Sequence, residues 1–202
     1  MDKETTVHNP WHSVTFKSKA KYNGKECENN EIVQAVIEIP SGSQAKYELD
    51  KESGLLRLDR VLYSAVHYPA NYGFIPQTYC DDNDPLDILV LSSINVHPLC
   101  IMNAKVIGLM HMVDGGEKDD KIIAVAANDQ SVSYINSIDE LPPHYEEQIC
   151  TFFSDYKKLE NKKVQVEDFS SREKALEVVN ESIKLYKEKF CGPDSPLKKK
   201  AQ

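Results

Sequence analysis

The sequence contains no long apolar run, no closely spaced cysteine pair and no excess of positive charge. No apolar segment approaches the ~20 residues that a membrane-spanning helix requires, so we expect no membrane span. The first residues, MDKETTVHNPWH, lack the apolar stretch of a secretory signal. The five cysteines are dispersed (Cys27, Cys80, Cys100, Cys150 and Cys191), which excludes a disulfide framework and a CxxC metal site. These absences together predict a cytoplasmic protein in a reducing compartment.

The charge balance and the missing motifs exclude further classes of protein. Lys and Arg total 24 against 32 Asp and Glu, a net charge of −8, which argues against nucleic acid as a partner. No HExxH motif, zinc spacing of histidines or GxxxxGK[ST] phosphate loop occurs. The stretch DDNDPLD (81–87) lacks the glycine and the glutamate of a calcium-binding EF-hand loop.

Apolar patterning predicts one α+β domain that is mainly β. Residues 1–30 are polar and form an expected N-terminal arm with Trp11 as its anchor. Residues 31–190 form the expected single domain, and residues 191–202 an expected disordered tail. Strands are predicted over 32–40, 45–50, 55–62, 86–92, 103–113 and 121–127. The segment HYPANYGFIP (67–76) is rich in Pro, Gly and Asn and is predicted to be a connection.

Two helices are predicted after the strands, over 141–160 and 170–190. Each carries an apolar stripe at helical spacing: Tyr145, Ile149, Phe152, Phe153 and Tyr156 in the first, and Leu176, Val179, Ile183, Tyr186 and Phe190 in the second. Ser170 followed by Glu173 predicts a capping box for the second helix. Strands followed by helices indicate an antiparallel sheet or a small barrel.

The stretch CDDNDPLDILVL (80–91) places four aspartates directly before an apolar strand. Two like charges ~4 Å apart repel by about 1 kcal/mol in water and about 4 kcal/mol near a protein surface. Either the carboxylates point into solvent or a positive group lies among them. Taken alone, the stretch favours a solvated turn, because Asp, Asn and Pro are turn-forming residues.

Charged residues inside the predicted strands say more about a functional site than charged residues in turns do. Residues two apart in a strand share a face, so Lys46 and Glu48 point the same way, as do Asp119 and Lys121. Each pair by itself is typical of a surface ion pair. Acids and bases on one face would suit an anionic substrate that arrives with Mg²⁺, since Mg²⁺ binds carboxylates together with substrate phosphate.

The DDNDPLD stretch resembles the signature of family I soluble inorganic pyrophosphatases, Asp-x-Asp-Pro-apolar-Asp. Four other blocks resemble the same family in the same order: IEIPSGSQAKYELDKESGLLRLDR, YPANYGFIP, DGGEKDDKIIAV and FFSDYKKLE. The resemblance covers 36–160. It implies a five-stranded OB-like β-barrel flanked by helices, and hydrolysis of pyrophosphate to two orthophosphates (EC 3.6.1.1) with several Mg²⁺ ions.

The resemblance also assigns roles to individual residues. Asp84 matches the general base. Asp82, Asp87 and Asp119 match the ligands of two water-activating metals, with Asp87 bridging them. Asp114, together with Asp119, matches the site of a metal that arrives with substrate. The phosphate-binding positions are Lys46, Arg60, Tyr72, Tyr156 and Lys157, and the supporting positions are Glu38, Glu48, Tyr68 and Lys121.

Two departures from the family pattern stand out. Gly115 lies where many bacterial members carry a second acid, which bears on the affinity of substrate-borne metals. The gap from Glu38 to Lys46 is one residue shorter than in some bacterial members. By analogy with the family, we expect a homo-oligomer.

Two alternative functions stay open at this level. One is metal-dependent hydrolysis of a nucleotide or a longer polyphosphate, which turnover of ATP against pyrophosphate would distinguish. The other is an OB-type barrel that binds nucleic acid, which would need a basic groove with stacking aromatics.

Overall fold

The computed structural model describes residues 9–192 except 20, 23–24 and 27–29, together with 195 and 197. Cys27, the first eight residues of the predicted arm and most of the predicted tail (191–202) lie outside the described residues. The other cysteines, Cys80, Cys100, Cys150 and Cys191, are free thiols.

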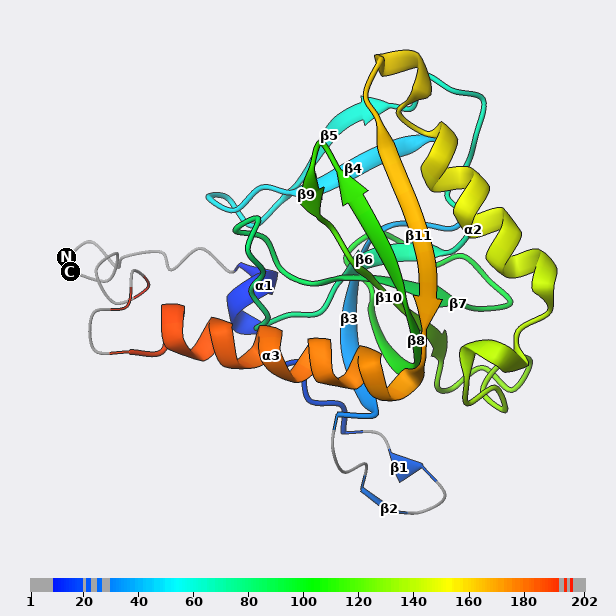
Figure 1. The fold of residues 1–202 in the computed structure, drawn as a ribbon. Helices are drawn as coiled ribbons and strands as arrows, with labels where there is room; N and C mark the ends of the chain where they lie inside the picture. Colours follow the sequence, from blue (N-terminus) through cyan, green and yellow to red (C-terminus); the bar gives the residue numbers. More distant parts are fainter. Residues whose placement is uncertain are drawn as a thin grey trace.

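Five strands pair in a closed ring at the centre of the molecule (Figure 1). They are β3 (Ile32–Ile39), β6 (Asn71–Phe74), β7 (Asp87–Leu91), β8 (Ile101–Asp114) and β10 (Lys121–Ala126). The order is β10-β7-β6-β3-β8, and β8 pairs again with β10 to close the ring. Only the β7–β10 pair is parallel among these five strands. The predicted mainly-β α+β class is confirmed.

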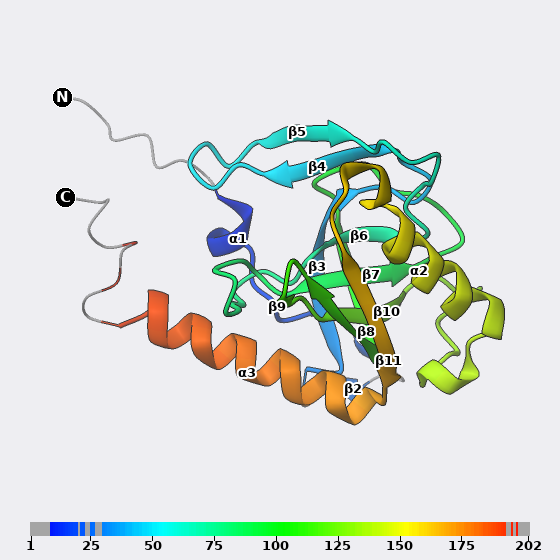
Figure 2. The same ribbon diagram turned by 45° about the horizontal axis from the view of Figure 1, so that its top comes forward.

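The other elements surround the ring. The remaining strands are β1 (Lys21–Tyr22), β2 (Lys25–Glu26), β4 (Ala45–Leu49), β5 (Leu56–Val61), β9 (Glu117–Lys118) and β11 (Val164–Ser170). The helices are α1 (Pro10–Ser13), α2 (Pro143–Asp155) and α3 (Arg172–Phe190), with 3₁₀ turns η1 (Ile138–Glu140) and η2 (Lys158–Glu160). The β4–β5 hairpin lies over one end of the ring, and α2 and α3 lie against its sides (Figure 2).

Strand alternation divides the core into two clusters. Ile88 and Val90 of β7 pack in the cluster that α3 covers with Val179, whereas Leu89 and Leu91 pack in the cluster that α2 covers. Successive residues of a strand point to opposite faces, so both faces of the ring are buried. This two-sided burial explains why the ring strands read as continuous apolar runs.

The six predicted strands are confirmed to within two residues at each end, but the prediction that 67–76 is only a connection is wrong. Residues Asn71–Phe74 form β6, which pairs with β3 on one side and β7 on the other. The glycine in this segment is required by packing, because a Cβ on Gly73 would lie 1.9 Å from the carbonyl oxygen of Val36. Asn71 is fully buried and bonds to Ser41 N, Val96 N and the Ile94 carbonyl.

Strand β11 was not predicted, although its residues alternate between half-buried and exposed at its start. It pairs with β8 from Val164↔Asp114 to Ser170↔Leu109. Strand β8 has 14 residues, which is long enough for it to pair with β3, β10 and β11.

Both predicted helices are present with corrected ends. Helix α2 stops at Asp155, five residues before the predicted end, and η2 follows. The stripe prediction for α2 is wrong at Tyr145, which is exposed, and correct for its other four members. The predicted capping box of α3 is also wrong: Ser171 is the N-cap and accepts from Lys174 N at 3.5 Å, while Ser170 belongs to β11.

The N-terminal segment packs against the ring. Trp11 of α1 is buried, and its indole Nε1 donates to the Thr78 carbonyl at 2.8 Å, which confirms Trp11 as the anchor. No helix among the described residues is long and apolar enough to cross a membrane.

Candidate active site

A cavity of about 310 Å³ opens where the β4–β5 hairpin, the acidic loop before β7 and the end of α2 meet. Every residue that the sequence predicts for the site, except Arg60, lines this cavity: Glu38, Lys46, Glu48, Tyr68, Tyr72, Asp82, Asp84, Asp87, Asp114, Asp119, Lys121, Tyr156 and Lys157. The ring thus brings together residues that are far apart in the sequence. The stretch DDNDPLD does begin as a turn with exposed residues, but Asp82, Asp84 and Asp87 also line the cavity.

The acidic loop has a defined backbone. Cys80 N donates to the Asp84 carbonyl at 2.9 Å, and Asn83 takes a left-handed conformation with φ of 69°. Asparagine tolerates that region better than most residues, which accounts for the Asn among the aspartates. Asp82 Oδ1 accepts from Asp84 N at 3.0 Å, so the loop turns tightly between these two acids.

A buried lysine balances two of the acids. Lys121 Nζ forms ion pairs with Asp87 and Asp119, and the predicted shared face of Asp119 and Lys121 is thereby confirmed. Burial acts to lower the pKa of Lys121, but the carboxylates of Asp87 and Asp119 outweigh it and raise the pKa. Tyr72 OH donates to Asp87 Oδ2 at 2.5 Å, and burial raises the pKa of Tyr72 well above its ordinary value. The Lys121 ammonium and the Tyr72 hydroxyl therefore keep their protons and act as hydrogen-bond donors.

The remaining predicted metal ligands line other parts of the cavity wall. Lys157 Nζ forms an ion pair with Asp114, and Tyr156 OH donates to the same carboxylate at 3.5 Å. Burial and neighbouring acids raise the pKa of Asp82, and burial also raises the pKa of Asp119. Burial is the larger cause of both pKa shifts and nearby acids add to it, so a bound cation would favour the charged form of each carboxyl group.

The β4 wall carries charges of both signs. Lys46 and Glu48 form an ion pair, which confirms that these two residues share a face. Glu38 of β3 lies behind them, buried, and its Oε1 accepts from Leu49 N at 2.6 Å. Burial raises the pKa of Glu38 to about 8.

Arg60 is the one predicted site residue that does not line the cavity. It pairs with Lys46 in the β4–β5 register, and its guanidinium bonds to Glu160 Oε1 at 2.7 Å and to Asp59. These two acids hold the side chain away from the cavity wall. Its Nη2 is buried and has no hydrogen-bond partner among the described residues, so this nitrogen is available to a further acceptor.

The donor set suits a hard divalent cation. Among the residues that the structure describes, no three acidic, histidine or cysteine side chains converge closely enough to bind a metal as they lie. Lys121 and Lys157 neutralise Asp87, Asp119 and Asp114 instead. Oxygen-only donors from several carboxylates in one cavity are nevertheless the ligands that Mg²⁺ prefers.

Sequence reasoning missed part of the cavity wall. Trp11 and Lys51 both line it, and Lys51 forms an ion pair with Asp84. Lys51 lies in the turn between β4 and β5, where a lysine is an ordinary surface residue. No spacing rule links it to the acidic loop, so only the tertiary structure reveals it.

Known proteins that resemble this chain point to a single family. The inorganic pyrophosphatase family matches residues 35–187. Soluble inorganic pyrophosphatase 2 of Chlamydomonas reinhardtii is 49% identical over 185 residues, covering 92% of each chain. Soluble inorganic pyrophosphatase 5 of Arabidopsis thaliana is 48% identical over 188 residues, covering 93% of this chain and 83% of its own length.

Solved structures agree with the sequence relatives. The inorganic pyrophosphatase of Thermus thermophilus superposes with a TM-score of 0.77 at 40% identity, covering 86% of this chain and 99% of its own. That of Helicobacter pylori gives a TM-score of 0.75 at 44% identity, covering 78% and 94%. The chain belongs to the family I soluble inorganic pyrophosphatases, which are enzymes of the inorganic diphosphatase class.

Proposed function

We propose that this chain hydrolyses inorganic pyrophosphate to two orthophosphates, with Mg²⁺ as its metal and Asp84 as its general base. One observation carries the proposal. A single cavity combines the carboxylates of Asp82, Asp84, Asp87, Asp114 and Asp119 with the cationic side chains of Lys46 and Lys157. An anionic substrate that arrives with divalent cations needs both kinds of group.

The metal would be held by Asp82, Asp87, Asp114 and Asp119, which supply only oxygen donors. Bound Mg²⁺ supplies a water of lowered pKa and neutralises phosphate charge. Family membership supports metal dependence in general, and the choice of Mg²⁺ rests on the donor chemistry.

Asp84 is suited to accept a proton. Its side chain lines the cavity, is half-exposed, and lies two residues from Asp82. The backbone of the loop directs both side chains to the same region through the bond from Asp84 N to Asp82 Oδ1. A carboxylate within reach of a water held next to Asp82 can act as general base.

The phosphate oxygens of the substrate would bind hydrogen-bond donors on the cavity walls formed by β4, β6 and the end of α2. Lys46 and Lys157 carry charge, while Tyr72 and Tyr156 add hydroxyl donors without charge. Burial raises the pKa of Tyr156 far above its ordinary value, so its hydroxyl remains a donor. Arg60 joins this set through its uncommitted Nη2 once its side chain turns from Asp59 towards bound phosphate. Such donors stabilise the charge of the transferred phosphoryl group.

Assembly and location form a second part of the proposal. We infer a homo-oligomer because β5 and the residues after it expose apolar side chains, including Leu58, Val61 and Tyr63. A cytoplasmic location follows from the free cysteines. Sedimentation equilibrium of the purified chain tests the oligomer, and a monomer would contradict it.

Release of orthophosphate from pyrophosphate tests the central proposal. We expect turnover with millimolar Mg²⁺, loss of turnover with a chelator, and recovery when Mg²⁺ is returned. ATP and tripolyphosphate serve as comparison substrates. Absence of turnover on pyrophosphate, or faster turnover of ATP, would contradict the proposed substrate.

A further inference from the structure

Lys51 lines the cavity, but it is neither a proposed metal ligand nor a proposed phosphate-binding residue. It follows β4 in the turn of the hairpin, and its Nζ forms an ion pair with Asp84. Both side chains are about half exposed, at 49% and 50%. An exposed ion pair stabilises a fold only weakly, so its contribution to folding does not explain the contact.

Two contacts from the N-terminal segment hold Lys51 in place. The side-chain Nδ2 of Asn9 donates to the Lys51 carbonyl at 2.9 Å. The Lys51 ammonium lies 5.5 Å from the centroid of the Trp11 ring, within cation–π range. Figures 1 and 2 both show α1 beside the turn between β4 and β5.

Trp11 is itself tied to the chain that enters the acidic loop. Its Nε1 donates to the Thr78 carbonyl, and its own carbonyl accepts from Gln77 N at 2.9 Å. The Trp11 ring is buried, so it forms a fixed surface under the lysine. Helix α1 thus connects the hairpin that carries Lys51 with the loop that carries Asp84.

The side chain of Asp84 depends on this lysine for its orientation. The backbone of Asp84 is fixed by Cys80 N and by Asp82 Oδ1. Among the residues that the structure describes, Lys51 is the one partner of the Asp84 carboxylate. A general base must lie within hydrogen-bond reach of the proton that it takes, and a further group commonly orients it there.

We propose that Lys51, anchored by Asn9 and Trp11, is a positioning residue for Asp84, holding one carboxylate oxygen so that the other faces the cavity. The inference rests on the proposed function, because it assumes that Asp84 is the base. The N-terminal segment then forms part of the active site.

Steady-state kinetics on pyrophosphate with saturating Mg²⁺ test the inference. Lys51→Met keeps a flexible, unbranched side chain of nearly the same length but removes the charge, and with it the ion pair to Asp84 and the cation–π contact with Trp11. We expect kcat to fall about 10-fold with KM within about twofold of wild type. Lys51→Arg should restore most of the lost kcat, because a guanidinium can also bind one carboxylate oxygen.

A double variant separates positioning from a general structural effect. In the Asp84→Asn background, Lys51→Met should cause no further loss of kcat, because its effect passes through Asp84. Asn9→Asp keeps a side-chain acceptor for the cap of α1 and removes the donor to the Lys51 carbonyl, and should lower kcat about twofold to threefold. Lys189→Met is the matched control: Lys189 lies 5.3 Å from the Tyr79 ring, outside the cavity wall, and its loss should leave kcat unchanged.

Each contrary result has a distinct meaning. A wild-type chain without pyrophosphate turnover removes the proposed function and the inference together. An active wild type with Lys51→Met at normal kcat overturns the inference alone. A raised KM at normal kcat, or an equal loss in the Asp84→Asn background, would show instead that Lys51 contacts phosphate or supports the fold.

Discussion

At the level of single residues, the cavity places most of its acids beside a basic group. Lys121 lies between Asp87 and Asp119, Lys157 contacts Asp114, and Lys51 contacts Asp84. Such pairing makes the crowded carboxylates tolerable at the edge of the core. It also keeps the basic groups close to where phosphate oxygens would bind.

Replacement of the proposed base should separate chemistry from folding. We expect Asp84→Asn to lower kcat by ~10²-fold or more, since a general base contributes ~10²–10⁴-fold. The melting temperature should stay within about 2 °C, because the side chain is half-exposed and its one ion pair is weak. Asp81→Asn is the control, since Asp81 is exposed in the same loop and does not line the cavity. Near-normal turnover of Asp84→Asn would argue against the assignment.

The buried carboxyl of Glu38 should make stability depend on pH. Its pKa is raised by burial from 4.5 to about 8. An acid with a raised pKa in the folded state favours folding below pH 4.5, and that contribution disappears as pH rises through 8. The stability advantage of Glu38→Gln over wild type should therefore grow by ~2–5 kcal/mol as pH rises from 5 to 9, since glutamine keeps an acceptor for Leu49 N but cannot ionise.

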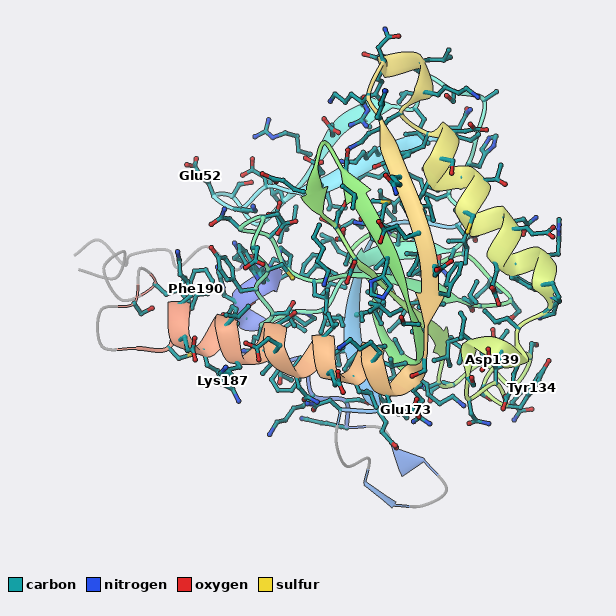
Figure 3. The ribbon with its side chains drawn as sticks, in the orientation of Figure 1. Glu52, Tyr134, Asp139, Glu173, Lys187 and Phe190 are labelled. Atoms are coloured by element: carbon teal, nitrogen blue, oxygen red, sulfur yellow. The ribbon has the colours of Figure 1, made fainter. Side chains whose placement is uncertain are left out.

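Urea unfolding at pH 5, 7 and 9 measures this difference. Glu52→Gln serves as the control because Glu52 is exposed at the hairpin turn and points away from the ribbon (Figure 3). A pH dependence for Glu38→Gln that parallels wild type would contradict the raised pKa.

At the level of elements, β6 shows how pairing overrides local composition. Asn71 and Gly73 within β6, and Pro69 and Pro76 on either side of it, all favour turns, so the segment looks like a loop in the sequence. Strands on both sides nevertheless supply its hydrogen bonds, and the glycine permits close contact with β3. The same strand carries Tyr72 into the cavity, so the fold of this segment and the site depend on each other.

A side chain at Gly73 should disrupt the ring. We expect Gly73→Ala to lower the free energy of unfolding by more than about 3 kcal/mol, because the added carbon overlaps backbone atoms of β3 rather than a movable side chain. The loss should appear as a lower melting temperature and a lower soluble yield. Gly192→Ala is the control, since the nearest atom to its added Cβ lies at an ordinary 3.6 Å. Equal stability of the two variants would refute the packing argument.

At the level of the whole molecule, the cavity forms only where separate parts of the chain meet. The β4–β5 hairpin, the acidic loop, the β8–β10 connection and the end of α2 each supply one wall. The closed ring holds these parts at fixed distances, since its strands pair on both edges. Ligands that bind between the walls should therefore stabilise the complete fold.

Divalent metal should raise the melting temperature. At 100 times its dissociation constant, a ligand that binds only the folded state adds ~2.7 kcal/mol, which corresponds to about 5–10 °C for a chain of this size. We expect Mg²⁺ to produce such a shift relative to KCl of equal ionic strength. Asp119→Asn should reduce the shift, because it removes one proposed ligand. Coincident melting curves with and without Mg²⁺ would contradict the metal site.

The sequence alone predicts most of the elements, and all but one of the predicted site residues, Arg60, line the cavity. Four of the six predicted strands, β3, β7, β8 and β10, stand out as apolar runs because both faces of the ring are buried, and the acidic stretch resembles the signature of the matched family. Element ends are less predictable: α2 stops five residues before its predicted end, and the N-cap of α3 is one residue later than the capping box indicates. These ends depend on packing against the ring rather than on local pattern.

Only the tertiary structure decided which distant residues meet. No local rule places Lys51 on Asp84, seats Trp11 in the cavity wall, or holds Arg60 on Glu160 and Asp59. The type of each side chain and its face on a strand follow from the sequence, because strand alternation is a local property. Contacts between loops follow from ring closure, which depends on pairing between segments far apart in the chain.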